Sequence, residues 1–382
     1  MTKKIVAIVL VVLMLGTALA ACGGGSATPS SSTPSSTPSS TPSSSTPSSS
    51  TPSSSTPSET KPAESENKKT YTIRFAMADP VGTIFDDYMA QPLIKLLDEN
   101  SGGRIQCELY PSGTVAAFGS GLDSARTGTS DIAQDAFSFY TGVYPYTELI
   151  NTPGIDYGSL SSFNTLIIDY AKAFPEDMDE FVVISRWAGS WFGFLMPNEP
   201  ITCLADLQGK TLRSTGSFMN YCTALGATGV MVTPNDLYEG IKLGVVDGAQ
   251  FTLGGTCSYG LYDVCNYFTP IEAYYGDTCF VLSRETYNLM DAEAQAAIDK
   301  TVEDFLAVAN KYSEANDQLS LDEILEKHNP DFKMYYMSDE AKAEVIKVAE
   351  PLLQAKADEL NALGLDGDGA LEWLRTNAKK YA

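Results

Sequence analysis

The sequence is poor in histidine and in positive charge. Its 382 residues include one His and 25 Lys and Arg against 48 Asp and Glu, so the formal net charge is −23. A single His excludes a His-rich metal site. His328 lies in a polar Glu-Lys-His-Asn-Pro stretch, which predicts a surface turn rather than part of a catalytic triad. No basic run is longer than a pair. This argues against nucleic acid as a partner, because neutralising phosphates requires clustered Lys and Arg.

Long apolar runs are missing beyond the N-terminal segment. No stretch after residue 70 has 18 consecutive apolar residues, so no transmembrane helix is predicted there. The composition is 43% hydrophobic and 10% aromatic, which is enough to bury a core and argues against global disorder.

The N-terminus has the pattern of a secretory signal. Two lysines precede a short apolar run over residues 5–15, and Leu19-Ala20-Ala21-Cys22 follows. Residues 1–21 resemble the signal peptide of a bacterial lipoprotein, in which Cys22 is lipidated and anchors the protein to the outer face of the cell membrane. The alternative is an ordinary signal that is cleaved after Ala21 and leaves Cys22 free.

Residues 22–70 are interpreted as the lipidated cysteine and a disordered tether. Ser26 to Thr60 repeats Ser-Thr-Pro-Ser units, which have nothing to bury and are expected to stay extended. In a polyproline-like form, at about 3.1 Å per residue, the repeats reach on the order of 100 Å. Anchor and tether together predict a domain held outside a membrane.

Strand and helix patterns alternate through the rest of the chain. This order predicts an α/β fold with mixed or parallel sheets and covering helices. The predicted strands are 71–77, 105–109, 131–133 and 181–187. The predicted helices are one from Met89 to a glycine stop at 102–103, then 122–126, 291–311, 338–360 and 371–381.

An arginine at the end of a short predicted strand is the first candidate ligand-binding residue. The Asp206-Leu207-Gln208-Gly209-Lys210 segment predicts a turn into a strand that ends at Arg213. Ligands bind at strand ends in open α/β sheets, and a guanidinium can hold a carboxylate with two hydrogen bonds. The alternative is a surface arginine paired with one of the many acids.

Four motifs around this arginine carry a family resemblance. They are Leu207–Arg213, Ala224-Leu225-Gly226-Ala227, Thr233–Tyr238 and Leu243-Gly244-Val245-Val246-Asp247-Gly248. Weaker matches precede them at Ser101–Ile105, Tyr110–Gly113 and Ala125–Ala133. In this order the motifs resemble the DctP-family solute-binding proteins of TRAP (tripartite ATP-independent periplasmic) transporters.

The resemblance implies a two-lobed, periplasmic-binding-protein-like fold of the class II type. It has mixed sheets, crossing strands and a long hinge-spanning helix within residues 283–325. The lobes are expected at residues 71–190 plus 280–318 and at residues 191–279 plus 319–382. A small organic acid would be trapped between them, with Arg213 on its carboxylate, and delivered to a TRAP permease. Neither catalysis nor a cofactor is implied.

The chain departs from the family elsewhere in the expected pocket. Many members carry a second cation or a polar residue where this chain has Trp191 and Phe192. A keto-acid-binding branch carries Glu-Trp where Gln250 and Phe251 stand, and a bound metal is not expected beside a neutral Gln250.

One arginine among aromatics predicts a pocket for a monocarboxylate with an apolar or flat body, because a dicarboxylate would need a second positive group. The aromatic candidates are Trp191, Phe192, Phe251 and Phe137, and each has membership of the lobe core as its alternative. Asp79 follows the first strand and is either a pocket residue or a cap or turn.

Other patterns are weaker. Asp366-Gly367-Asp368-Gly369 lacks the remaining acids of a calcium loop and is interpreted as a turn. Six cysteines after Cys22 permit up to three disulfides or free buried thiols. A ligand-sensing lipoprotein and a secreted hydrolase with paired carboxylates are the alternative functions, although no motif marks such a pair.

Overall fold

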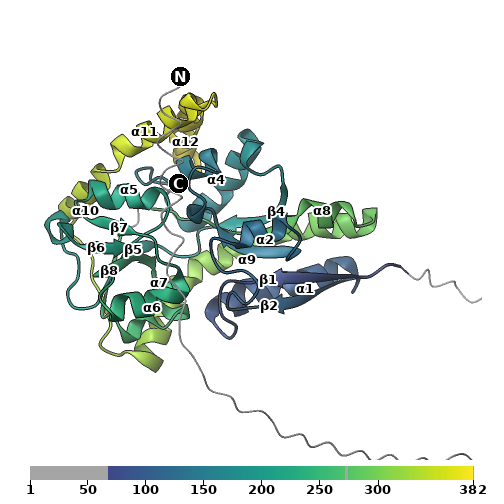
Figure 1. The fold of residues 1–382 in the computed structure, drawn as a ribbon, viewed down its shortest axis with the longest axis horizontal. Coiled ribbons are helices and arrows are strands. Elements are labelled where there is room, and N and C mark those ends of the chain that lie inside the picture. The colour runs from purple at the N-terminus through teal and green to yellow at the C-terminus, as the bar shows by residue number, and fades with distance from the viewer. Residues whose placement is uncertain (1–67, 272–273, 382) are drawn as a thin grey trace, which may run out of the picture. The chain divides into compact units, whose positions relative to one another are not determined.

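The computed structural model describes residues 68–271 and 274–381. The predicted signal peptide, Cys22 and nearly all of the predicted tether lie outside these residues. Within them the chain forms two β-sheets surrounded by helices (Figure 1). No helix in this described part is long and apolar enough to cross a membrane.

The first sheet is mixed and contains five described strands in the order β2-β1-β3-β10-β4. Strand β1 is parallel to β2 and β3, whereas β10 is antiparallel to β3 and β4. The strands are β1 (Tyr71–Ala76), β2 (Ile105–Tyr110), β3 (Ile132–Ala136), β4 (Phe181–Trp187) and β10 (Thr278–Ser283). The four strands predicted from sequence are confirmed here. In β1 the alternating Ile73 and Phe75 are buried in the core, as the pattern requires.

The second sheet has the order β11-β9-β5-β8-β6-β7 among the described strands. Strand β6 is parallel to β7 and β8, and β5 is antiparallel to β8 and β9. The strands are β5 (Phe192–Met196), β6 (Thr211–Arg213), β7 (Thr228–Val230), β8 (Gly248–Thr252), β9 (Tyr267–Pro270) and β11 (Lys333–Met334).

Helix ends follow the capping residues of the sequence. Helix α1 (Gln91–Ser101) has Pro92 in its first turn and ends at Gly102, whose φ of 63° is left-handed. The other helices are α2 (Gly121–Arg126), α3 (Pro145–Ile150), α4 (Leu160–Ala173), α5 (Ser217–Ala224), α6 (Pro234–Lys242), α7 (Leu253–Ser258), α8 (Arg284–Asn288), α9 (Ala292–Glu323), α10 (Asp339–Lys347), α11 (Glu350–Ala362) and α12 (Gly367–Tyr381).

The long helix α9 connects the two halves of the fold. It contacts α1 and β4 beside the first sheet and α7 beside the second (Figure 1). The chain also crosses between the sheets from β4 to β5 and from β9 to β10. This is the predicted α/β fold with mixed sheets and a spanning helix. The predicted range 283–325 is interrupted, because α8 ends before Asp291 caps α9 through the amide of Ala294 (3.0 Å).

Three sequence predictions near the C-terminus are wrong. Residues 338–360 form two helices, because Pro351 lacks an N–H and starts a new helix at α11. Asp366–Gly369 is a helix start rather than a turn, since Asp366 accepts from the amide of Gly369 (2.9 Å) at the head of α12. His328 is exposed as predicted, but it ends the π-helix η6 (Ile324–His328) instead of lying in a turn, and its ring centre lies 4.4 Å from that of Tyr262.

The six described cysteines are free, and three of them are buried. No group of three His, Cys, Asp or Glu side chains in the described part is arranged to hold a metal ion.

The C-terminal helices pack far from their neighbours in sequence. Helices α11 and α12, yellow in Figure 1, contact α3, and α12 also contacts α4. Leu353, Leu360 and Leu371 share a buried apolar cluster with Phe163. Residues 319–382 therefore contact helices of both predicted lobes. The division of the chain into lobes stays a prediction.

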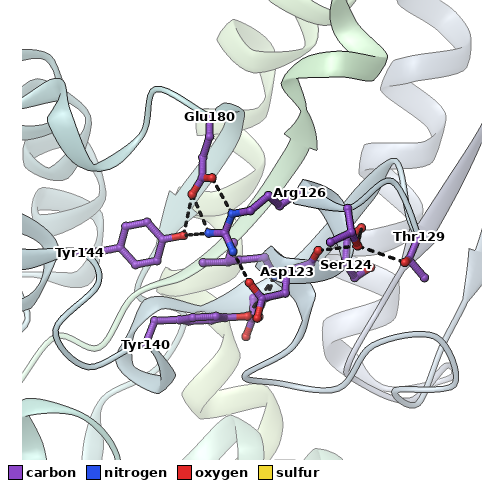
Figure 2. A network of polar contacts seen from close by, with 10 residues as sticks. Asp123, Ser124, Arg126, Thr129, Tyr140, Tyr144 and Glu180 are labelled. Atoms are coloured by element: carbon purple, nitrogen blue, oxygen red, sulfur yellow. Dashed lines mark hydrogen bonds and ion pairs between the residues drawn. The ribbon is translucent and has the colours of Figure 1, made fainter.

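A polar network holds the segment that follows β3. Arg126 of α2 forms hydrogen bonds with Glu180 (2.6 and 2.7 Å) and with the hydroxyl of Tyr144 (2.8 Å), as Figure 2 shows. Beside it, the Tyr140 hydroxyl donates to Asp135 at 2.6 Å. These contacts fix both ends of a loop whose middle residues, 138 and 139, reach the cavity described next.

Candidate ligand-binding site

The two sheets and α9 enclose a cavity of about 790 Å³, including its mouth. The first sheet contributes Asp79, which follows β1, and Gln134 of β3. The second sheet contributes Phe192, Arg213 and Phe251 from β5, β6 and β8. Small-molecule sites in proteins usually occupy such clefts between parts of a fold.

Arg213 is the only Lys or Arg among the described residues that line this cavity. It ends β6, and the residue is 3% exposed. Nε donates to the carbonyl oxygen of Val232 (2.9 Å) and Nη1 to that of Gln250 (3.2 Å). Both partners are neutral, so these bonds orient the guanidinium without neutralising its charge.

The charge of Arg213 is buried, which is unfavourable for a cation. No acidic side chain in the described ranges forms an ion pair with it, and burial lowers its pKa to about 10. A buried cation without an anionic partner carries a desolvation cost that an entering anion would offset. The cavity therefore offers a prepared position for one negative group.

Aromatic rings form the walls around this cation. The guanidinium carbon lies 4.8 Å from the ring centre of Phe251 and 5.9 Å from that of Phe139. Two glycines leave room for the rings of Phe251 and Phe192. A Cβ at Gly255 would lie 2.5 Å from the Phe251 ring, and one at Gly276 would lie 2.6 Å from Phe192. The walls are flat and apolar, which suits a planar ligand body.

A buried carboxyl lies on the first-sheet side of the cavity. Asp79 is 7% exposed, and one of its oxygens accepts from the Gln134 amide. Burial raises the pKa of Asp79 to about 6, while contacts with Gln134 and the Tyr259 hydroxyl act in the opposite direction.

A second arginine lies behind the wall. Arg186 of β4 pairs with Asp277 at 2.6 Å, and their side chains are 3% and 0% exposed. Asp277 lines the cavity, and Asn151 donates a hydrogen bond to it. Because Arg186 already has its carboxylate, it does not supply a free charge for a ligand.

Four of the seven predicted pocket residues line the cavity: Arg213, Phe192, Phe251 and Asp79. The structure places the other three outside it. Gln250 bonds to Ser214 (2.7 Å) and Cys222, on the face of β8 opposite to Phe251. Trp191 packs on Tyr275. Phe137 packs on Tyr144 and lies 4.7 Å from the Arg186 guanidinium.

The sequence reasoning missed several lining residues. Gln134 could have been found, since it lies in β3, the strand that directly precedes Phe137. Tyr312 and Asn316 are four residues apart on α9, a spacing that places them on one helix face but equally fits core packing. Phe139 ends the short 3₁₀-helix Phe137–Phe139 and Tyr259 directly follows α7, and neither position carries such a signal.

Residues 86–359 match the bacterial extracellular solute-binding protein family 7, DctP. The 2,3-diketo-L-gulonate-binding periplasmic protein YiaO of Escherichia coli is 22% identical over 208 residues. That alignment covers 53% of this chain and 63% of YiaO, so it spans less than two thirds of the relative.

Two solved structures share the fold. A TRAP solute-binding protein from Rhodoferax ferrireducens, in complex with copurified benzoate, has a TM-score of 0.75 at 18% identity and covers 82% of this chain and 98% of its own. A marine metagenome TRAP protein specific for aromatic acid ligands has a TM-score of 0.73 at 19% identity, with 81% and 99% covered. Such neighbours are two-lobed α/β binding proteins rather than enzymes. The chain belongs to family 7 of the bacterial extracellular solute-binding proteins, the DctP family of TRAP transporter components.

Proposed function

We propose that this protein captures a small monocarboxylate between its two sheets and delivers it to a TRAP permease. The observation that carries the proposal is the buried Arg213, which has oriented donors and no acidic partner among the described residues. A carboxylate placed against it would accept charge-assisted hydrogen bonds in a dry environment, where they are strong.

The other charges of the cavity favour one carboxylate over two. Asp79 and Asp277 both line the wall, and Arg186 is paired with the latter. A second carboxylate on the ligand would meet acidic groups and no free cation. The aromatic walls, together with the benzoate and aromatic acids bound by the two similar structures, support a flat organic acid.

Closure of the two parts around the ligand would complete the site. Cavity residues come from both sheets, so only a closed arrangement surrounds a small molecule. The crossing segments and α9 connect the parts and would act as the hinge. The closed form is then the one that a permease distinguishes from the empty protein.

A thermal-shift screen of the purified protein tests this function. The ligands are aromatic and aliphatic monocarboxylates, dicarboxylates, neutral sugars and amino acids. A monocarboxylate at 100 times its dissociation constant is expected to add about 2.7 kcal/mol, a shift of several degrees. A screen in which no acid shifts the transition, or in which neutral sugars do so equally, contradicts the proposal.

We also propose that Cys22 is lipidated and holds the protein on the outer face of the cell membrane. The signal-like segment before Cys22 and the Ser-Thr-Pro repeat after it support this reading. In cells, Cys22→Ala is expected to move the protein from the membrane fraction to the soluble extracytoplasmic fraction, whereas Cys203→Ala should not. If the Cys22 variant stays in the membrane fraction, another anchor is at work.

A further inference from the structure

A second pair of polar groups lines the cavity apart from Arg213. Asp79 follows a strand of the first sheet, and Tyr259 follows α7, whereas Arg213 ends a strand of the second sheet. We propose that this Asp79–Tyr259 pair binds a hydroxyl group of the ligand, so that the preferred ligand is a hydroxylated monocarboxylate. The inference rests on the proposed function, because it takes the carboxylate to be bound by Arg213.

The Asp79 carboxyl is held in a fixed orientation. The Gln134 amide oxygen accepts from the backbone amides of Ala78 (2.9 Å) and Asp79 (3.1 Å), so its nitrogen must point to the Asp79 side chain. Only one carboxyl oxygen is used by this contact. The other is an acceptor at the cavity wall beside the Tyr259 hydroxyl.

The Tyr259 hydroxyl is a buried donor next to that carboxyl. Its contact with Asp79 lowers the pKa of Asp79 and raises that of Tyr259, but the geometry of this contact is too poor for a full hydrogen bond, and the hydroxyl has no other partner among the described residues. A buried hydroxyl without a well-formed hydrogen bond is destabilising. Such a group in a cavity wall is explained most simply by a partner that arrives with the ligand.

A hydroxyl fits this pair better than other ligand groups. It accepts one hydrogen bond from Tyr259 and donates one to Asp79, so it satisfies both. An ammonium only donates and leaves the Tyr259 proton without an acceptor on the ligand. A second carboxylate only accepts and would be repelled by Asp79.

Another buried carboxyl shows that this arrangement is particular to Asp79. Burial also raises the pKa of Asp317 to about 6. However, Asp317 uses both oxygens within the protein, accepting from the Ser190 hydroxyl and the Trp191 amide (3.2 Å), and it does not line this cavity. Asp317 therefore serves as a matched control.

The test compares acids that differ by one hydroxyl. Calorimetry measures the dissociation constants of the purified protein for benzoate, 3-hydroxybenzoate and 4-hydroxybenzoate. It also measures those for phenylacetate, 3-hydroxyphenylacetate and 4-hydroxyphenylacetate, and for 3-(aminomethyl)benzoate. At least one hydroxylated acid is expected to bind tenfold or more tightly than its parent. Tyr259→Phe and Asp79→Asn should each reduce this ratio below threefold, whereas Tyr262→Phe and Asp317→Asn should preserve it.

Different outcomes distinguish a wrong hydroxyl site from a wrong carboxylate-binding function. If parent acids bind through Arg213 but no hydroxyl improves affinity, or if the ratio survives in Tyr259→Phe and Asp79→Asn, the hydroxyl site is wrong and the carboxylate site stands. Tighter binding of the aminomethyl acid than of every hydroxylated acid also overturns the hydroxyl site. If no acid binds at all, the proposed function fails and this inference with it.

Discussion

Replacing Arg213 by alanine is expected to weaken monocarboxylate binding at least 100-fold. The reason is that the ligand carboxylate would be moved from water into the cavity without its only available cation. Truncating one partner of a buried charge pair costs about 3–5 kcal/mol, and each 1.4 kcal/mol is tenfold in affinity. Calorimetry with the tightest acid from the screen measures the loss.

The same substitution should leave the ligand-free fold intact. The lowered pKa of Arg213 indicates that its charge is penalised in the empty protein, and alanine removes that penalty. The carbonyl oxygens of Val232 and Gln250 lose a donor but gain access to water from the cavity. The two effects oppose each other, so we expect the unfolding free energy to change by about 1 kcal/mol or less.

Two companion variants make the result specific. Arg213→Lys keeps the charge but loses the planar pair of donors, so its affinity should lie between those of wild type and alanine. Arg126→Ala removes a positive charge from a partly exposed network and should leave the affinity unchanged. If Arg213→Ala binds within threefold of wild type, Arg213 is not the carboxylate ligand.

The position of Arg213 was predictable because two independent signals meet there. The strand that it ends is bounded by a clear turn, and family motifs flank it on both sides. The alternation in β1 was equally clear, since Ile73 and Phe75 are buried and Thr72 is exposed. Signals of this kind are local, so a single sequence contains them.

The faces of the cavity strands were not predictable in the same way. Strands β5 and β8 are buried along nearly their whole length, so no polar alternation marks which residues point to the ligand. Trp191 and Phe192, like Gln250 and Phe251, are chemically plausible neighbours, and only the structure shows that the second of each pair lines the cavity. The register alone would not select these two rings, because it pairs Phe192 with Thr252 and Gly193 with Phe251 and so puts the rings on opposite faces of the sheet. The helix break before α11 was hidden similarly, because Val345, Leu352 and Leu353 continue the apolar pattern across it.

Replacing Arg186, the other buried arginine, should lower the stability of the ligand-free protein, which replacing Arg213 should leave nearly unchanged. Arg186→Met is expected to lower the unfolding free energy by about 3–5 kcal/mol, because it leaves the Asp277 carboxylate buried without its cation. Asn151 would still donate a hydrogen bond, but one neutral donor does not replace a charge. Denaturant unfolding of the ligand-free protein measures the change.

A double-mutant cycle shows whether the loss comes from the unpaired charge. Arg186→Met combined with Asp277→Asn removes both charges and should recover most of the lost stability, which gives a coupling of more than about 1 kcal/mol. Arg126→Met is the control. Its pair with Glu180 is 37% exposed on both sides, so its removal should cost less than about 1 kcal/mol. Equal losses for Arg186→Met and Arg126→Met would mean that burial does not distinguish the two pairs. Taken with Arg213→Ala, the cycle separates an arginine that stabilises the cavity wall from one whose charge is left for the ligand.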